Sequence, residues 1–373
     1  MVEPAITALT EQLKKLGNAS SLHSAGRAAR KDLEQAREII AEAIDCAASE
    51  VVFTSTGTEA NNLAVKGLYW QGVKSNKKVI ITSTFEHHAV ADPINWLAEH
   101  EGAQVVRIGV DRDGFIDLVE LKEKVSEHKN NVALISIMHS NNEVGTLQDI
   151  DQVVKIAGNI PVHSDCVQSF GKVDLSFNKL GLTAATISAH KIGGPLGVAA
   201  LILKRGLDIE PVLHGGGQER DLRSGTFNVP GIISFAAAAK NAVENRKERE
   251  LKVRELKQEL IETIKKNISD AWVNGNIDKS LPGIVSITFP KTDSEGLLLL
   301  LDGEGIACST GSACSAGVQR PSHVLLAMGL TEDETTSTLR FSLSYTNTIN
   351  EIAKLGSVIA TVVARSKAAS GKK

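Results

Sequence analysis

The sequence predicts a doubly wound α/β fold built around a mostly parallel sheet. Several short apolar runs are typical of buried strands, and segments long enough to form helices separate them. Most of these runs end in polar residues, as expected for parallel strands whose carboxyl ends share one edge of a sheet. Ligands collect at that edge, so the polar ends are the first place to look for function.

Composition restricts the possible functions. A chain of 373 residues suits about two domains, and its net charge of −3 argues against a nucleic-acid binder or a polybasic membrane protein. The longest apolar runs, such as 297–301, are too short to span a bilayer, and the N-terminus resembles no signal segment. Four cysteines without a CxxC pair favour a reducing compartment, and we expect a cytoplasmic protein.

The first elements are two helices and a strand. Apolar residues at helical spacing predict helices over residues 5–17 and 27–45. Residues 51–55 are strand-like and run into a turn of small residues, after which a helix is expected from about Leu63.

The turn between this strand and helix is a candidate anion site. Free backbone N–H groups at Gly57 and Thr58 and the dipole of the following helix would face a phosphate. The alternative is an ordinary capping box, with Thr56 as the cap and Glu59 as its partner.

The strand predicted at 79–82 leads to two adjacent histidines, His87 and His88. Neighbouring side chains on an extended chain point to opposite faces, so the pair is poorly placed to chelate one metal. One imidazole could stack on a flat cofactor and move protons near neutral pH, whereas the alternative is two solvated histidines.

Two further strands end in amides and an acid. The strand predicted at 132–138 is followed by Asn141 and Asn142, which could hold a phenolic oxygen or a carboxylate, or shape a turn. After the strand at 160–163, the extended period places Asp165 and Val167 on one face, while Cys166 points into the core.

The strand predicted at 183–187 ends in Ser188, His190 and Lys191, before two glycines and a proline break the chain. A lysine at this edge can form a Schiff base with a carbonyl cofactor, and Asp165 can pair with a pyridinium nitrogen. These are the protein groups that pyridoxal phosphate requires. The alternative is a surface lysine beside a turn.

The C-terminal third predicts a second domain. Residues 238–266 are typical of a long, charged helix that leads into it, and strands are expected at 283–289 and 339–343. Arg340 lies in an apolar stretch, where its positive charge needs a carboxylate partner. This partner could be structural or could be the carboxylate of a substrate.

Small residues fill the segment 306–317, which contains Cys308 and Cys314. A cysteine on such a loop could reach a substrate and attack it as a thiolate, whereas the alternative is a tight turn with a buried thiol. The spacing of the two cysteines is not typical of zinc sites.

Taken together, these motifs closely resemble the pyridoxal-phosphate-dependent cysteine desulfurases of the NifS/IscS-like group. The resemblance runs from about Asn18 to the strand around Arg340. It rests on an ordered set: Thr-Gly-Thr-Glu at 56–59, Glu-His-His-Ala-Val at 86–90, Asn-Asn-Glu-Val-Gly at 141–145, Asp-x-x-Gln at 165–168, Ser-x-His-Lys at 188–191, His-Gly-Gly-Gly at 214–217, Arg-Ser-Gly-Thr at 223–226 and Thr-Gly-Ser-Ala-Cys at 310–314.

The resemblance implies catalytic roles for three residues. Lys191 would carry the cofactor and move protons, His87 would stack on the ring, and Cys314 would take sulfur from L-cysteine as a persulfide, leaving L-alanine. The residues implied to bind cofactor or substrate are Gly57, Thr58, Ser188, His190 and Thr226 at the phosphate, Asp165 at the pyridine nitrogen, Gln168 and Asn142 at the ring oxygen, and Arg340 with Asn142 at the substrate carboxylate. Thr226 would come from the partner subunit of a homodimer.

The family architecture implied is the transferase fold type I. It has a large domain with a mostly parallel seven-stranded sheet, expected at 12–245, and a smaller α+β domain at 246–373 that carries the cysteine loop 306–320. Residues 1–11 are expected to pack on the small domain. An iron–sulfur scaffold or a tRNA-thiolating protein would accept the sulfur; neither nucleic acid nor membrane is expected as a direct partner.

Two departures from the family bear on catalysis rather than on the fold. The family commonly begins with a segment like Tyr-Leu-Asp-Asn-Ala-Ala-Thr-Thr-Pro, and Met1 falls about where that segment should end. Cys166 stands where alanine is common. The alternatives are therefore a selenocysteine lyase or another enzyme of the same fold, or a noncatalytic dimer that keeps the cofactor pocket.

Overall fold

The computed structural model describes residues 1–311 and 321–371. The chain forms two compact units. The first comprises Met1–Ile108, Leu118–His139 and Asp149–Arg246, and the second comprises Gly109–Asp117, Ser140–Gln148 and Lys247–Lys373. Two short segments from the first half of the chain, Gly109–Asp117 and Ser140–Gln148, therefore belong to the second unit. The sequence did not predict this.

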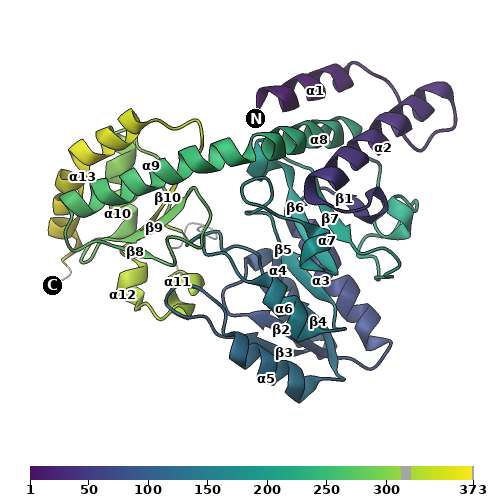
Figure 1. The fold of residues 1–373 in the computed structure, drawn as a ribbon, viewed down its shortest axis with the longest axis horizontal. Helices are drawn as coiled ribbons and strands as arrows, with labels where there is room; N and C mark the ends of the chain where they lie inside the picture. Colours follow the sequence, from purple (N-terminus) through teal and green to yellow (C-terminus); the bar gives the residue numbers. More distant parts are fainter. Residues whose placement is uncertain (312–320, 372–373) are drawn as a thin grey trace. The chain divides into compact units, whose positions relative to one another are not determined.

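A seven-stranded sheet forms the centre of the first unit, in the order β1-β7-β6-β5-β4-β2-β3 (Figure 1). Only β7 runs against its neighbours, β1 and β6, so the sheet is mostly parallel. The strands are β1 (Val51–Thr54), β2 (Val79–Ser83), β3 (Gln104–Ile108), β4 (Val132–Ser136), β5 (Val162–Asp165), β6 (Ala184–Ser188) and β7 (Ala199–Leu203).

Every residue of β2, β4, β6 and β7 is buried, because helices cover both faces of the sheet. This explains why these strands are continuous apolar runs without the alternation of a half-exposed sheet. The helices of this unit are α1 (Glu3–Leu13), α2 (Ser24–Ile44), α3 (Gly57–Val73), α4 (His88–Glu101), α5 (Leu118–His128), α6 (Ile150–Ala157), α7 (Phe177–Leu180) and α8 (Val229–Glu244), with short 3-10 turns at Ala48–Glu50, Ala189–Ile192 and Glu219–Asp221.

Helix α3 begins at Gly57, earlier than the start expected near Leu63. Thr56 caps it, since the Thr56 hydroxyl accepts a hydrogen bond from the Glu59 N–H at 3.0 Å. The Glu59 carboxylate accepts from the Ser55 N–H at 2.8 Å, one residue before the position of a capping box. Thr56 is thus the cap that the alternative interpretation named, while Glu59 binds the Ser55 N–H in place of the Thr56 N–H. The cap leaves the N–H groups of Gly57 and Thr58 at the helix start.

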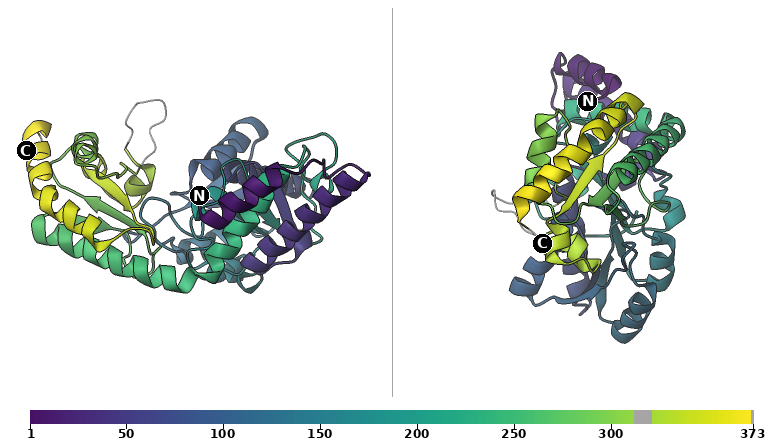
Figure 2. Two further views of the ribbon diagram at one scale, coloured as in Figure 1. Left: turned by 90° about the horizontal axis from the view of Figure 1, so that it is seen from above. Right: turned by 90° about the vertical axis from the view of Figure 1, so that its left-hand side faces the viewer.

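The N-terminal helix α1 lies along α8 (Figures 1 and 2). The Ser234 hydroxyl of α8 donates to the Ala5 carbonyl at 2.7 Å, and the Val2 N–H donates to the Gly193 carbonyl at 2.8 Å. Residues 1–11 therefore pack within the first unit, and not on the small domain as expected from the sequence. The long helix expected over 238–266 is two helices, since α8 ends at Glu244 and α9 (Arg246–Asn267) follows.

The second unit contains an antiparallel sheet in the order β10-β9-β8. Its strands are β8 (Trp272–Asn274), β9 (Ile284–Thr288) and β10 (Thr338–Ser342), and its helices are α9, α10 (Ser294–Gly303), α11 (His323–Ala327), α12 (Glu332–Thr335) and α13 (Ile349–Ser370). Apolar residues of α9, β9 and α13 form one buried core that includes Leu260, Ile287 and Val362. The strands expected near 283–289 and 339–343 are confirmed.

Candidate active site

Three segments of the first unit meet at the carboxyl edge of the sheet. Strands β5 and β6 are parallel neighbours, with Asp165 opposite Thr186, so both end at this edge. A Cβ atom on Gly57, at the start of α3, would lie 3.1 Å from Val167 Cγ2 and 3.7 Å from Ser188 Cβ. The helix start thus approaches both strand ends closely, which brings together three regions that the sequence singled out.

Asp165 is the buried acid of this edge. Its Oδ1 accepts from the Val167 N–H at 3.0 Å, and its Oδ2 accepts from Asn61 Nδ2 at 2.6 Å. Burial raises the pKa of the Asp165 carboxyl, while these hydrogen bonds and the charges of His87 and Lys191 act to lower it. A cationic ring nitrogen placed against this carboxylate would favour its ionised form.

Lys191 follows β6 in a single 3-10 turn that ends at Gly193, whose φ of 81° suits glycine. In the same turn, Ser188 Oγ lies 2.9 Å from His190 Nδ1. Burial and the charges of Lys191 and Lys172 lower the pKa of His190, so its imidazole is neutral near pH 7. Lys191 is exposed on this turn, and its charge acts to lower the pKa of both Asp165 and His190, which indicates that its amine lies near both residues.

The two adjacent histidines have different environments. His87 caps helix α4, and its Nδ1 accepts from the Ala89 N–H at 3.0 Å. His88 lies 3.1 Å from Asp92 on an exposed helix face, with a side chain that is 69% exposed. The charge of His87 acts to lower the pKa of Asp165. The two histidines do differ, but because His87 caps helix α4 and His88 lies in its first turn, and not because they alternate along a strand as expected.

The remaining predicted cofactor residues have simpler surroundings. Gln168 Oε1 accepts from Lys172 Nζ at 3.1 Å, and Thr58 lies exposed in the first turn of α3. Thr226 is exposed in the loop after Ser224. The structure therefore brings Gly57, Asp165 and Ser188 together, while it gives Thr226 no place in this cluster.

Two buried residues beside this edge were missed in the sequence. Asn61 is 1% exposed and holds Asp165, and Glu86, also 1% exposed, accepts from Ser83 Oγ at 2.5 Å and from the Met138 N–H at 2.9 Å. Burial raises the pKa of Glu86 to about 8. Two signals in the sequence could have revealed them. Asn61 is a polar residue on the apolar face of a helix, and Glu86 is an acid just before His87.

The second unit positions Arg340, the predicted partner of a carboxylate. Its Nη1 donates to the Asn142 carbonyl at 2.9 Å, and its backbone pairs with that of Ser309 in both directions. Burial lowers the pKa of Arg340, and the Glu143 charge acts against this shift. Within residues 1–311 and 321–371, the Nε atom of Arg340 has no hydrogen-bond partner, so the guanidinium keeps donors for an anion.

Glu143 lies near Gly311 and Ser322, the described residues on either side of the segment 312–320. Its Oε2 accepts from the Ser322 hydroxyl at 2.5 Å, and a Cβ atom on Gly311 would lie 3.1 Å from the same oxygen. Cys314 itself lies outside the described residues. One buried carboxylate thus binds Ser322 just after the segment 312–320 and lies beside Gly311, the residue before it.

The other cysteines lack the features of a nucleophile. Burial and the charge of Asp302 raise the pKa of Cys308 to about 11, and burial raises that of Cys166 to about 12. Both thiols are therefore protonated near neutral pH, and a protonated thiol is a weak nucleophile. Cys166 is fully buried, as predicted.

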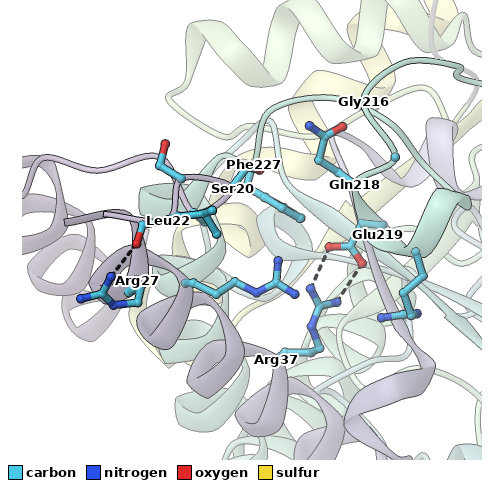
Figure 3. A pocket seen from close by; sticks show the side chains of 13 residues that line it. Ser20, Leu22, Arg27, Arg37, Gly216, Gln218, Glu219 and Phe227 are labelled. Carbon is cyan, nitrogen blue, oxygen red and sulfur yellow. Dashed lines mark hydrogen bonds and ion pairs between the residues drawn. The ribbon is translucent and has the colours of Figure 1, made fainter. Parts of the chain in front are cut away.

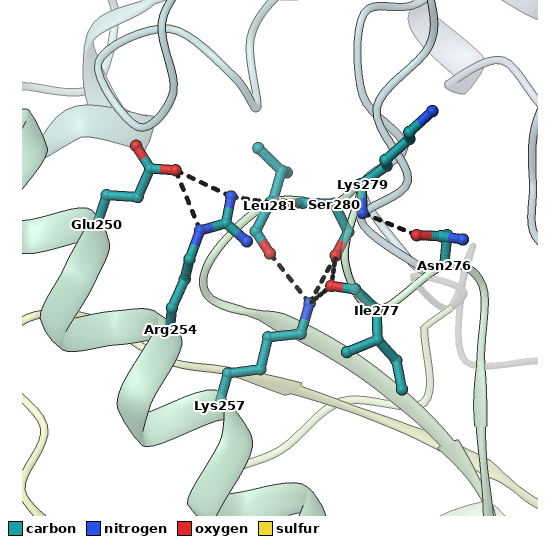
Figure 4. A network of polar contacts seen from close by, with 8 residues as sticks. All are labelled: Glu250, Arg254, Lys257, Asn276, Ile277, Lys279, Ser280 and Leu281. Atoms are coloured by element: carbon teal, nitrogen blue, oxygen red, sulfur yellow. Dashed lines mark hydrogen bonds and ion pairs between the residues drawn. The ribbon is translucent and has the colours of Figure 1, made fainter.

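A polar network supports the segment Ser140–Gln148 (Figure 4). Lys257 of α9 donates to Ser280 Oγ at 2.7 Å and to the Leu281 carbonyl at 3.2 Å. The Leu281 N–H in turn donates to the Gly145 carbonyl at 2.9 Å, and Ser280 forms a β-bridge with Thr146. The segment that supplies Asn142 is therefore held to residues 279–281, between β8 and β9, and through them to α9.

In the described parts of the chain, no group of His, Cys, Asp or Glu side chains is arranged to hold a metal ion. In those same parts, no helix is long and apolar enough to cross a membrane.

Comparisons with known proteins agree with this arrangement. The family model for class-V aminotransferases matches residues 1–355. The IscS-like cysteine desulfurase of Mycobacterium tuberculosis is 44% identical over 98% of this chain and 94% of its own length. The chain therefore belongs to the class-V aminotransferase family, in its branch of IscS-like cysteine desulfurases.

Solved structures support the same assignment. A NifS-like protein superposes with a TM-score of 0.90 at 34% identity, over 98% of this chain and 96% of its own. A structure described as SspA in complex with cysteine superposes with a TM-score of 0.79 at 31% identity, over 93% and 97% of the two chains. These matches confirm the predicted resemblance and the predicted fold.

Proposed function

We propose that this protein is a pyridoxal-phosphate-dependent cysteine desulfurase that converts L-cysteine to L-alanine and leaves a persulfide on Cys314. The observation that carries the proposal is the cluster at the carboxyl edge of the sheet, where Asp165, Lys191 and the start of α3 meet. Membership of the desulfurase branch selects this activity over a selenocysteine lyase or a noncatalytic dimer.

The residues at this edge fit pyridoxal phosphate. The absence of a side chain at Gly57 leaves room at the helix start, and the N–H groups there suit a phosphate. Asp165 is a buried acid of raised pKa that a pyridinium would keep ionised. The residues that would hold the group are Gly57, Thr58, Ser188 and His190 at the phosphate, Asp165 at the ring nitrogen, His87 on the ring face, Gln168 and Asn142 at the ring oxygen, and Lys191 at the aldehyde carbon.

When bound, pyridoxal phosphate supplies an electron sink that stabilises negative charge on the substrate carbons. Lys191 would take a proton from the substrate α-carbon and return protons to the product. Neutral His190 would form a hydrogen bond with the phosphate without adding a positive charge to the site. Arg340 would bind the substrate carboxylate through donors that the Asn142 carbonyl leaves available.

The sulfur transfer needs no external oxidant. The Cys314 thiolate attacks the substrate sulfur, an S–S bond forms, and the C–S bond of the substrate breaks. The electron pair of that bond stays with the substrate carbon, which takes a proton and becomes the methyl group of alanine. Glu143, which accepts a hydrogen bond from Ser322 and lies beside Gly311, would fix the ends of the segment that carries Cys314.

Several finer features belong to the same proposal. The protein would act as a homodimer in which Thr226 of one subunit reaches the phosphate of the other, since Thr226 is exposed in its own chain. An iron–sulfur scaffold or a tRNA-thiolating protein would accept the persulfide. Free thiols at Cys46, Cys166 and Cys308 suit a reducing cytoplasm.

Replacing the nucleophile tests the proposal. Cys314→Ser should release no alanine and carry no persulfide, whereas Cys308→Ser should keep both activities because the Cys308 thiol is protonated. Alanine is measured by a coupled dehydrogenase assay and the persulfide by mass spectrometry of the alkylated protein. Alanine release by Cys314→Ser at the unmodified rate would overturn the assignment of this residue.

A further inference from the structure

Glu86 is a buried acid to which the reaction proposed above assigns no role. It follows β2 and directly precedes His87, the residue expected to stack on the cofactor ring. Glu86 is 1% exposed, and its neighbours Ser83 and Phe85 are buried as well, so its carboxyl group lies in the interior of the first unit. Burying such a group costs free energy unless hydrogen bonds compensate for the lost contact with water.

The carboxyl group of Glu86 completes the hydrogen bonding where β2 and β4 separate. The backbone pairing of these two parallel strands ends at Thr82 and Ser136. Beyond that point, the Met138 N–H donates to Glu86 Oε1 at 2.9 Å, and the Ser83 hydroxyl donates to the same oxygen at 2.5 Å. Because a buried backbone N–H needs an acceptor, the carboxyl group replaces the strand carbonyl that β2 no longer supplies.

The end of β4 connects Glu86 to Asp165. The N–H of His139, the residue after Met138, donates to the Asp165 carbonyl at 3.0 Å. The charge of Asp165 also acts on the Glu86 carboxyl group. Along the chain, Glu86 is followed directly by His87, which caps α4. Glu86 is therefore linked to both residues that are expected to address the ring, Asp165 at its nitrogen and His87 on its face.

The elements packed around Glu86 carry four other ionisable side chains, His87 at the cap of α4, His139 after β4, and His163 and Asp165 on β5. Burial, with a smaller contribution from the charge of Asp165, raises the pKa of Glu86 to about 8, against the effect of its two hydrogen bonds. Burial lowers the pKa of His139 to about 4 and that of His163 to about 3, so neither imidazole supplies a positive charge near pH 7. Near neutral pH, Glu86 is therefore an uncharged acid, whereas a bound pyridinium would keep Asp165 ionised.

We propose that Glu86 is a positioning residue for the cofactor: as an uncharged acid, it fixes His87 and the end of β4, and it leaves Asp165 as the negative charge that meets the ring nitrogen. This inference rests on the proposed function, which places the ring at this edge of the sheet. An ionised carboxylate at Glu86 would put a second negative charge close to Asp165 in a buried place, which is unfavourable. An uncharged acid keeps both hydrogen bonds without that charge.

Cofactor affinity tests the positioning role. Glu86→Met keeps a side chain of similar length and removes the acceptor for the Met138 N–H and the Ser83 hydroxyl. In fluorescence titrations of the full-length apoprotein, this variant should bind pyridoxal phosphate about tenfold more weakly, because a buried N–H beside the site loses its acceptor. The visible band of the bound cofactor should also change, because the ring loses its fixed contact with His87. Glu86→Gln keeps an amide oxygen as the acceptor and should restore most of the affinity and the band.

Glu50→Met is the matched control. Glu50 is a buried acid of the same unit that also accepts from two backbone N–H groups, those of Ala47 at 2.8 Å and Arg205 at 2.9 Å. It precedes β1 and so lies at the opposite edge of the sheet, where its loss should destabilise the fold and leave the cofactor affinity unchanged. Ser83→Ala, which removes one of the two hydrogen bonds to Glu86, should weaken cofactor binding less and serves if Glu86→Met does not fold.

Two results would overturn the positioning role. One is unchanged affinity in Glu86→Met, or in Ser83→Ala where that variant replaces it, and the other is an equal loss of affinity in Glu50→Met. Either result would leave the proposed function intact, since the unmodified protein would still bind pyridoxal phosphate. Failure of the unmodified protein to bind it would overturn the proposed function and this inference with it.

The pH dependence of unfolding tests the uncharged state of Glu86 and needs no cofactor. In the native apoprotein Glu86 keeps its proton up to about pH 8, whereas in the unfolded chain its pKa returns to the ordinary value of 4.5. The native state therefore binds one more proton between these values, and its stability falls as the pH rises. Between about pH 5 and 7, the equilibrium constant for unfolding of the unmodified protein should rise about tenfold per pH unit relative to that of Glu86→Gln, in guanidinium titrations. Parallel pH dependences would show that Glu86 is ionised in the native protein and would overturn the proposal.

Discussion

The hydrogen bond from Asn61 to Asp165 offers the sharpest test of how the chain prepares its acid for a pyridinium. Asn61 Nδ2 lies 2.6 Å from Asp165 Oδ2, and the two residues are 1% and 6% exposed. Asn61→Leu keeps the volume of the side chain and removes its donor. The Asp165 carboxylate then keeps only the Val167 N–H among its described donors.

The expected effect follows from the strength of such bonds. A hydrogen bond to a charged group contributes about 1.5–3 kcal/mol, which corresponds to roughly one to two pKa units. Burial already raises the pKa of Asp165, so losing this bond raises it further. The ionised form is then populated only at higher pH. We therefore expect pyridoxal phosphate to bind at least about tenfold more weakly near pH 7, and its affinity to recover in part as the pH rises.

Fluorescence titration of the apoprotein with pyridoxal phosphate at several pH values between about 6 and 9 measures this effect. Asn62→Leu is the control, because Asn62 is the adjacent asparagine and donates only to the Thr58 carbonyl at 3.0 Å. Asn62→Leu should show the pH profile of the unmodified protein. Equal cofactor affinity in Asn61→Leu and the unmodified protein at every pH would refute the role of this bond.

Two further predictions concern the second unit. Burial lowers the pKa of Lys257 to about 8, so the unfolded chain binds more protons above that pH and stability rises with pH. Relative to Lys257→Met, the free energy of unfolding of the unmodified protein should therefore increase by about 2.5 kcal/mol from pH 7 to pH 10 in guanidinium titrations; no difference in slope would contradict this. Glu143→Gln should slow persulfide formation about tenfold at an unchanged cofactor spectrum, since a neutral amide holds Ser322 less tightly, whereas the exposed Glu304→Gln should not. Equal rates in both would show that Glu143 does not position the segment.

Local patterns were sufficient to predict the sheet and most of its edge. The strands are continuous apolar runs, and parallel strands must end together, so Asp165 and Lys191 could be assigned to one edge from their positions alone. The cap at Thr56 was also predictable, because a cap depends on residues within one turn of it.

Features that depend on distant partners could not be predicted in this way. The segment Ser140–Gln148 joins the second unit through the bridge between Thr146 and Ser280, and no local pattern specifies that register. Helix α1 was expected on the small domain because its amphipathic face does not say which surface covers it. The buried ion pair of Arg37 and Glu219 (Figure 3) could not be predicted either, since each residue alone is typical of an exposed helix or loop.

The visible absorption spectrum of the purified protein, recorded before and after addition of L-cysteine, tests the central claim most directly. A band of bound pyridoxal phosphate that changes when L-cysteine is added, and that is absent from Lys191→Ala, is the predicted result. Borohydride reduction followed by mass spectrometry should then locate the cofactor on Lys191. A protein that binds no pyridoxal phosphate when it is supplied, or whose band does not respond to L-cysteine, would contradict the assignment of a desulfurase site to this edge of the sheet.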